Sequence, residues 1–170
     1  SLKINVRYII KNILCGIQNS NYPISYSKIT NVKKEYLNLI GLDKNVNDIA
    51  PLDFIGYSTS ILEMKHIQQD ESYSDINIHS DYTVTDKADG ERKLLLINSK
   101  GELNLLNSRL DVQYTGIKTN KKEYYNTIID CEHIWNNEIN MYAAFDIYYL
   151  NGNEENKEKT KGPIFKNPFW

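Results

Sequence analysis

The sequence is poor in cysteine and has no long hydrophobic run, and each absence excludes a class of protein. Two cysteines among 170 residues, Cys15 and Cys131, are too few for a disulfide scaffold or a four-thiolate zinc site. No stretch approaches the ~20 apolar residues that a membrane span needs. The apolar run at 8–10 is cut by Lys11 and Asn12, which is unlike a signal peptide. We therefore expect a soluble protein of the reducing cytoplasm, without membrane association.

Neither sign of charge predominates in the sequence. Lys and Arg number 20 and Asp and Glu number 22, which gives a net charge of −2 and a pI near 5.9. Binding as a polybasic nucleic-acid coat needs a clear basic excess, so that class is excluded, whereas a local basic groove is not. Isoleucine, asparagine, lysine and tyrosine, whose codons are rich in A and T, are abundant, which indicates an AT-rich genome. Such a genome does not favour arginine, so the three arginines of the sequence are of particular interest.

The first sixty residues carry helical patterns. Apolar residues recur at helical spacing over 4–17, and the pattern 33–40 predicts a second helix, capped by Thr30 or Asn31. Residues 60–67 are typical of one or two further helical turns. We interpret residues 1–60 as an N-terminal helical and connecting segment.

From residue 82 onward the sequence is typical of β-strands. Apolar and β-branched runs alternate with Asn- and Gly-containing turns, and residues 98–101 are a hairpin signal. The predicted fold class is α+β, an antiparallel β-meander with the N-terminal helices packed beside it. The expected strands are 82–85, 93–97, 102–106, 127–134 and 139–150.

A lysine in a glycine-containing turn lies between two of these strand signals. Lys87 is followed by Ala88, Asp89, Gly90, Glu91 and Arg92, where the backbone is open to a phosphate. Lysine is a nucleophile only when neutral, so its pKa must be lowered by partial burial or by a cationic neighbour such as Arg92. The alternative is a plain hairpin with Asp89 and Gly90 at its tip.

The pattern Lys-x-Asp-Gly-x-Arg at 87–92 resembles the first motif of the covalent nucleotidyltransferases, which include mRNA-capping guanylyltransferases and polynucleotide ligases. Three later segments resemble further motifs in the family's order: Ser108 with Arg109, 127–132, and 142–152. The run 82–92 is most similar to the guanylyltransferase domain of capping enzymes from large cytoplasmic DNA viruses. A DNA or RNA ligase remains the alternative, because 144–152 suits a ligase nearly as well.

The resemblance implies a reaction and a role for each motif residue. Lys87 would attack the α-phosphate of GTP, and the resulting lysine–GMP would pass GMP to a diphosphate RNA 5′ end. Arg92 and Glu132 would contact the ribose, and Arg109 would bind phosphate, ribose or the acceptor end. Phe145 would stack on the purine. The residues alone leave two further readings open, in which Arg109 is a surface arginine and Phe145 a core aromatic.

The same resemblance implies Mg²⁺ or Mn²⁺ with GTP as substrate, and RNA as partner. Fused or associated triphosphatase and methyltransferase domains would complete capping. His66, His79 and His133 lack ligand spacing, so we assign no metal ligands. The expected location is the cytoplasm, within a viral factory or virion if the protein is viral.

The sequence also departs from the family pattern. Cys131 stands where the third motif usually has glycine, and no later phosphate- or metal-binding motif, or oligonucleotide-binding domain, precedes Trp170. We therefore assign 61–170 to a partial nucleotidyltransferase domain and expect the isolated chain to be inactive. A non-catalytic nucleotide-binding or scaffolding relative is the remaining alternative.

Strand alternation predicts which side chains share a face. Asp130 and Glu132 should share one face, which we expect to be wet or to line a site, because two carboxylates are costly to bury unpaired. The same counting places Arg92 with the apolar leucines at 94 and 96. It also places Phe145 with Ile147 and with the residues at 139, 141 and 143.

Overall fold

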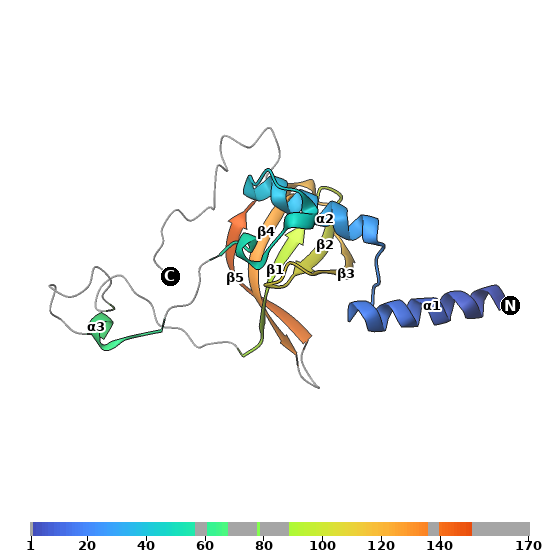
Figure 1. Cartoon of the computed structure of the whole chain (residues 1–170), viewed down its shortest axis with the longest axis horizontal. Coiled ribbons are helices and arrows are strands. Elements are labelled where there is room, and N and C mark those ends of the chain that lie inside the picture. Colours follow the sequence, from blue (N-terminus) through green and yellow to red (C-terminus); the bar gives the residue numbers. More distant parts are fainter. Residues whose placement is uncertain (1, 57–60, 68–77, 79–88, 136–139, 151–170) are drawn as a thin grey trace.

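The computed structural model describes residues 2–56, 61–67, 78, 89–135 and 140–150 of the chain. Helices near the N-terminus are followed by an antiparallel β-sheet, and α2 lies across one face of that sheet (Figure 1). The α-helices are α1 (Leu2–Gln18), α2 (Tyr26–Ile40) and α3 (Met64–Ile67), and the 3₁₀ turns are η1 (Val46–Asp48), η2 (Pro51–Asp53) and η3 (Lys122–Tyr124). The strands are β1 (Glu91–Ile97), β2 (Glu102–Leu106), β3 (Val112–Lys118), β4 (Thr127–Trp135) and β5 (Asn140–Tyr149).

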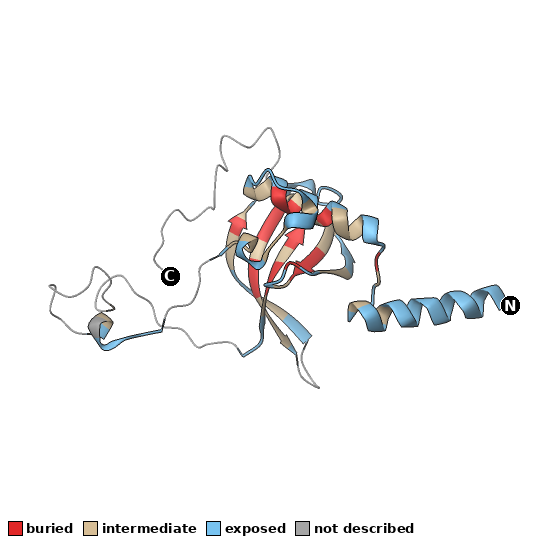
Figure 2. Ribbon diagram, in the orientation of Figure 1, coloured by how far each residue is buried: buried red, intermediate tan, exposed pale blue. Residues whose placement is uncertain are grey.

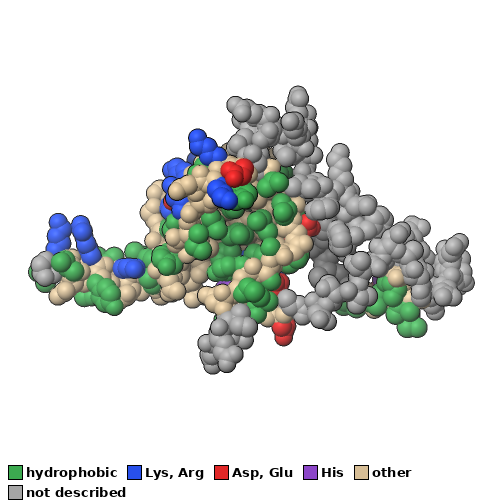
Figure 3. All heavy atoms as spheres, turned by 180° about the vertical axis from the view of Figure 1, so that it is seen from behind, with side chains coloured by type: hydrophobic (Ala, Val, Ile, Leu, Met, Phe, Trp, Pro, Cys, Tyr) green, Lys and Arg blue, Asp and Glu red, His purple; other side chains and the backbone are tan. Residues whose placement is uncertain are grey.

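Helix α1 confirms the periodic pattern of the first segment, but it projects from the sheet domain and buries none of its residues (Figures 1 and 2). Its apolar side chains are exposed, including Ile13 at 55% and Ile17 at 75%. Basic side chains lie along it (Figure 3), and its first turn has no acidic residue. Its C-terminal end is fixed by Gln18, which exchanges two hydrogen bonds with the backbone of Ile24 at 2.8 and 2.9 Å.

Helix α2 begins earlier than the sequence predicts. Ser25 is the N-cap, and its hydroxyl accepts from the backbone N–H of Lys28, so the expected cap at Thr30 or Asn31 is wrong. Thr30 instead lies within the helix and donates its hydroxyl to the carbonyl of Tyr26 at 3.0 Å. The C-terminal end is as expected from Gly41, whose φ of 74° is left-handed.

The sheet order β3-β2-β1-β4-β5 corrects the simple meander. Strands β1 to β3 are a meander, but β4 returns to pair with the other edge of β1, and β5 then pairs with β4. The difference arises because β3 was absent from the expected strands. The pairs 93–97 with 102–106 and 127–134 with 139–150 are confirmed within one or two residues, whereas the expected strand 82–85 lies outside the described residues.

One hydrophobic core joins α2 to the sheet. The buried side chains that form it come from α2, from β1, β2, β4 and β5, and from the turn after β2 (Figure 2). These residues are Val32, Tyr36, Leu37, Leu94, Leu96, Leu106, Leu110, Ile128 and Tyr148. The N-terminal segment therefore supplies part of the core on which the sheet depends.

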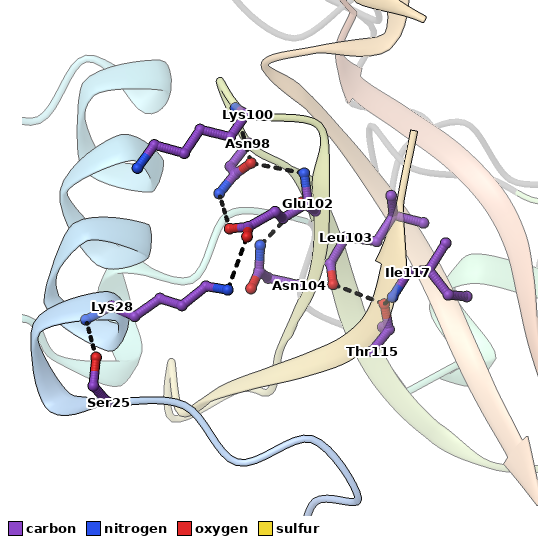
Figure 4. Close-up of polar contacts among 9 residues, drawn as sticks. All are labelled: Ser25, Lys28, Asn98, Lys100, Glu102, Leu103, Asn104, Thr115 and Ile117. Carbon is purple, nitrogen blue, oxygen red and sulfur yellow. Dashed lines mark hydrogen bonds and ion pairs between the residues drawn. The ribbon is translucent and has the colours of Figure 1, made fainter. Parts of the chain in front are cut away.

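A polar cluster fastens α2 to the hairpin between β1 and β2 (Figure 4). The ammonium of Lys28 lies 2.9 Å from Glu102 Oε1, and Asn98 Nδ2 donates to Glu102 Oε2 at 3.2 Å. Asn98 Oδ1 in turn accepts from the backbone of Glu102 and Lys100. Burial alone would raise the pKa of Glu102, but the hydrogen bonds from Lys28 and Asn98 hold it below its usual range.

The helical turns expected over 60–67 are reduced to α3, the four residues Met64–Ile67. In the part of the chain that the structure describes, no helix has the length and apolar character to cross a bilayer.

Because α1 buries nothing, removing it should leave the sheet domain intact. Deleting residues 1–16 should change the melting temperature by less than about 2 °C. Leu37→Ala, which empties a core position that is 2% exposed, should cost about 2–5 kcal/mol in unfolding free energy. Thermal unfolding gives the melting temperatures of the truncated protein and of Leu37→Ala, and urea unfolding gives their unfolding free energies. A truncation as costly as Leu37→Ala would show that α1 packs against the domain.

Candidate functional site

Lys87 lies outside the described residues, but the chain that follows it is fixed against β4. A Cβ added at Gly90 would lie 2.3 Å from the carbonyl oxygen of His133 and 3.0 Å from Cγ of Glu132. No side chain fits there, so the glycine allows the backbone at Gly90 to touch β4. From Gly90 the chain enters β1 directly beside Glu132.

Arg92 and Glu132 are cross-strand neighbours. They lie opposite each other in the β1–β4 register, and Leu94 lies opposite Asp130. Directly opposed residues share a face of the sheet, so the expected faces of Arg92, Asp130 and Glu132 are confirmed. Two motif residues that are 40 positions apart in the sequence are thus brought together.

Arg92 has a protein partner that the resemblance did not imply. Its Nε donates to Oδ1 and Oδ2 of Asp130 at 3.0 and 3.2 Å, and its Nη2 also donates to Oδ2. Asp130 has no exposed surface, so at this residue the face that we expected to be wet or to line a site is instead buried, and the carboxylate is paired. A buried carboxylate needs a hydrogen-bonded cation, and this bidentate pair supplies one. The hydrogen bonds that Arg92 donates to Asp130 raise the pKa of Arg92.

Tyr148 of β5 completes the network. Its hydroxyl donates to Asp130 Oδ2 and accepts from Arg92 Nη2 at 3.1 Å. Burial, with the adjacent carboxylate, raises the pKa of Tyr148 well above its ordinary value. Sequence reasoning missed this role, because a tyrosine in an aromatic-rich strand carries no signal of its partner.

The N-terminal segment covers this network. The hydroxyl of Tyr36 donates to the carbonyl of Asp53 at 2.7 Å and accepts from the N–H of Ile55 at 2.9 Å. That anchoring holds Phe54 over the guanidinium of Arg92, with 5.6 Å between Cζ and the ring centroid. It also holds Gly56, where a Cβ would lie 2.2 Å from Arg92 Nη2.

Glu132 differs from Asp130. It is half-buried, and among the residues that the structure describes it makes no hydrogen bond or ion pair. Its carboxylate oxygens therefore remain available as acceptors for a hydroxyl group. The role that the resemblance gives Glu132 at the ribose stays a prediction.

Phe145 lies in an irregular part of β5. The β4–β5 register shifts between Asp130 and Cys131, so Ala143 lies opposite Glu132 whereas Ile147 lies opposite Ile129. The expectation that Ala143 and Ile147 share a face is therefore wrong, because a bulge breaks strict alternation. Phe145 itself is 61% exposed, which contradicts the core-aromatic reading.

Arg109 is not brought to Arg92 and Glu132. It lies in the turn after β2, with its side chain 78% exposed and its Nε 3.8 Å from Asp111 Oδ2. It lines a cavity at the end of the sheet together with Lys93, the neighbour of Arg92 whose side chain points to the opposite face.

Cys131 is accommodated in the third motif because its side chain points away from Glu132. It is buried, and its thiol donates to the carbonyl of Lys93 at 3.0 Å. Burial, with the nearby charge of Asp130, raises its pKa to about 11, so the thiol is protonated at neutral pH.

The described residues contain no group of three His, Cys, Asp or Glu side chains that could hold a metal ion. The carboxylate of Asp130 already accepts hydrogen bonds from Arg92 and Tyr148, so it is not available as a metal ligand. These residues do not fit a protein-held metal, so no step is assigned to one.

Comparison with known proteins identifies a distant relative. The chain is 31% identical over 150 residues to a protein described as a probable mRNA-capping enzyme of Acanthamoeba polyphaga mimivirus. The match covers 88% of this chain but 12% of the relative, so the chain spans about an eighth of that protein's length. No protein-family model matches the chain.

Substituting either partner of the Arg92–Asp130 pair should lower the unfolding free energy, but by unequal amounts. Arg92→Met leaves a fully buried carboxylate without its cation and should cost about 3–5 kcal/mol. Asp130→Asn should cost less, because the Arg92 side chain is 32% exposed and can reach water. Urea unfolding measures both, with Arg109→Met as the surface-arginine control. The double variant should lose less unfolding free energy than the two single variants lose in sum. Strictly additive losses would contradict a direct coupling between Arg92 and Asp130.

Proposed function

This chain is a distant homologue of a viral protein described as a probable mRNA-capping enzyme, and on that premise we propose that it carries the nucleophile and ribose contacts of a GMP-transferring domain. The substrate would be GTP and the acceptor a diphosphate RNA 5′ end. Since the chain matches about an eighth of the relative, the other steps of capping would be performed by other domains or subunits.

The observation that carries the proposal is the apposition of Arg92 and Glu132 beside Gly90, three residues after Lys87 in the sequence. The first motif supplies Lys87 and Arg92, and the third supplies Glu132, yet β1 and β4 place Arg92 opposite Glu132. A guanidinium and an unengaged carboxylate on one sheet face form a donor and an acceptor for sugar hydroxyl groups. A plain hairpin at 87–92 would not require this pairing.

The proposed chemistry has two balanced steps. The neutral amine of Lys87 attacks the α-phosphorus of GTP, a P–N bond forms, the bond to the β-phosphate oxygen breaks, and pyrophosphate leaves while the amine loses a proton. In the second step an oxygen of the RNA 5′-diphosphate attacks the same phosphorus. The P–N bond then breaks, and Lys87 recovers its proton. A divalent ion bound to the triphosphate would offset its charge.

The pair with Asp130 changes the part that Arg92 plays toward Lys87. A lone cation lowers the pKa of a neighbouring amine, but the carboxylate of Asp130 compensates much of the charge of Arg92. We therefore assign Arg92 to ribose positioning rather than to activation of the lysine. Partial burial of Lys87 would supply the activation.

Incubation of the full-length protein with GTP and Mg²⁺ should leave GMP on Lys87 through an acid-labile, alkali-stable bond. Lys87→Arg should abolish labelling, because a guanidinium stays protonated. Intact-mass analysis and peptide mapping identify the labelled residue. Residues 1–170 alone should label negligibly, because the family's later phosphate-binding motifs are not visible in this sequence.

The nucleotide and the site of labelling decide between the alternatives. Labelling with ATP instead of GTP would place the protein among the ligases. Absence of any label on the full-length protein would favour the non-catalytic reading. GMP on a lysine other than Lys87 would overturn the assignment of the nucleophile.

Phe145 gives a separate test of base stacking. Because its ring is 61% exposed, Phe145→Ala should leave the melting temperature unchanged. Loss of stacking worth ~1–3 kcal/mol should raise the KM for GTP in self-labelling about 5- to 150-fold. Met141→Ala, at a 47% exposed position of the same strand, is the matched control and should change neither quantity. An unchanged KM with Phe145→Ala would exclude the stacking role.

A further inference from the structure

Helix α1 presents apolar side chains that no other part of the described structure covers. Around the helix axis they lie along one continuous arc, which we call the apolar arc. Its members are Leu2, Val6, Ile9, Ile10, Ile13, Leu14 and Ile17. All of them are exposed, from 38% at Leu14 to 82% at Leu2. A contiguous apolar surface of this kind marks an interaction site.

The composition of α1 does not favour a free-standing helix. Five isoleucines, one valine, two asparagines and one glycine make up nine of its 17 residues, and all have a lower helix propensity than alanine or leucine. The helix contains no acidic residue, so its basic residues form no ion pairs within it. A helix of this length is marginal without packing, because most helical stability comes from the buried face. The helix therefore needs a surface that covers the apolar arc.

The basic side chains of α1 form one row beside the apolar arc. Lys3, Arg7 and Lys11 are spaced four residues apart, which places them on the same side of the helix (Figure 3). Within the part of the chain that the structure describes, none of the three has an ion-pair partner. The row thus carries three positive charges without compensation. A surface that covers α1 should supply carboxylates along this row.

Apolar side chains also lie beyond the basic row. Ile4 and Tyr8 follow it around the helix, and both are 66% exposed. A helix that lies on a bilayer has a strongly charged face opposite its apolar face, and α1 lacks such a face. A groove in a protein, which can enclose several sides of the helix, therefore suits α1 better than a membrane surface. Pairing of α1 with the same helix of a second copy would bring like charges together without any acidic partner.

The C-terminal end of α1 is held in a fixed direction on the sheet domain. Gln18 exchanges its two hydrogen bonds with the backbone of Ile24, and the carbonyl of Asn19 accepts from Nε2 of Gln113 in β3 at 2.8 Å. A helix whose direction is set beforehand loses less conformational entropy when it docks. This favours a contact between neighbouring domains of one polypeptide.

We propose that α1 docks into an apolar groove, rimmed by acidic side chains, on a neighbouring domain of the same polypeptide. The viral relative has room for such a domain, because the match with this chain covers 12% of its length. The apolar arc would fill the groove, and Lys3, Arg7 and Lys11 would meet the acidic rim. The inference goes beyond the proposed GMP transfer and does not depend on it, because it involves none of the residues of the nucleotide site.

Hydrogen exchange of the α1 amides, compared between the full-length protein and residues 1–170, tests the docking. In residues 1–170 these amides should exchange with little protection, because an unpacked helix opens at almost no cost in free energy. In the full-length protein they should exchange at least ~30-fold more slowly, because the groove buries several apolar side chains. Mass spectrometry of peptides from α1 measures both rates, and peptides from β1 and β4 are the internal reference.

Two variants of the full-length protein carry the same new charge and separate docking from helix stability. Ile13→Asp places a carboxylate in the apolar arc, so α1 should exchange as fast as it does in residues 1–170. Asn12→Asp adds that charge at the adjacent exposed position, outside the arc, and should stay within about 3-fold of the wild-type rate. If both variants lose protection equally, the effect lies in helix stability and the docking is rejected.

The acidic rim has its own test in Arg7→Gln. At low salt this variant of the full-length protein should lose protection of α1 about 2- to 5-fold, because one ion pair with the rim is removed. At high salt the difference from the wild type should disappear, because exposed charges are screened. Unchanged protection in Arg7→Gln at low salt would reject an acidic rim.

Three results would overturn the choice of a neighbouring domain. Equal exchange of α1 in the full-length protein and in residues 1–170 would show that no other domain covers it. Protection in residues 1–170 that increases with protein concentration would assign the apolar arc to a second copy. Protection that appears only with vesicles of phosphatidylcholine and phosphatidylserine would assign it to a membrane surface.

Discussion

The buried carboxylate of Asp130 is the constraint on which the described structure depends. A charge with no exposed surface is stable only with a cation and hydrogen-bond donors around it, and Arg92 and Tyr148 supply both. Asp130 lies on β4, Arg92 on β1 and Tyr148 on β5. Their hydrogen bonds therefore fix the register of the three strands that carry the first, third and fourth motif segments. A slip of one residue in β1 would send the guanidinium to the opposite face and leave Asp130 unpaired.

The N-terminal segment belongs to the same arrangement through Tyr36. That residue is buried in the core and also holds the backbone of the 53–55 turn with its hydroxyl, so helix packing sets the position of Phe54 and Gly56 over Arg92. A helix that looks merely connective in the sequence therefore shapes the environment of a motif arginine. The physical link is a single hydroxyl that both donates and accepts.

Local patterns predicted the elements well, and long-range contacts account for what they missed. Periodicity identified α1, and the Asn98–Gly101 turn identified the β1–β2 hairpin. Strand β3 was missed because Gly116 and a register shift opposite it in β2 weaken the pattern of a regular strand. For the site, the family resemblance assigned Arg92 and Glu132 to the same ribose, but the engagement of Asp130 depends on β5. A bulge in β5 likewise reversed the faces that counting assigned around Phe145.

Arg92 and Glu132 share one face of the sheet, and they differ in how cleanly a loss of function can be separated from a loss of stability. Arg92 is bonded to a buried acid, so any loss of activity on its removal is mixed with loss of stability. Glu132 shares the same face, is half-buried, and has no partner among the described residues. A ribose role on this face is therefore measured cleanly at Glu132, whereas at Arg92 it requires correction for unfolding. The conservative change Glu132→Gln keeps the volume and removes the charge, and it isolates the acceptor strength of the carboxylate from its packing.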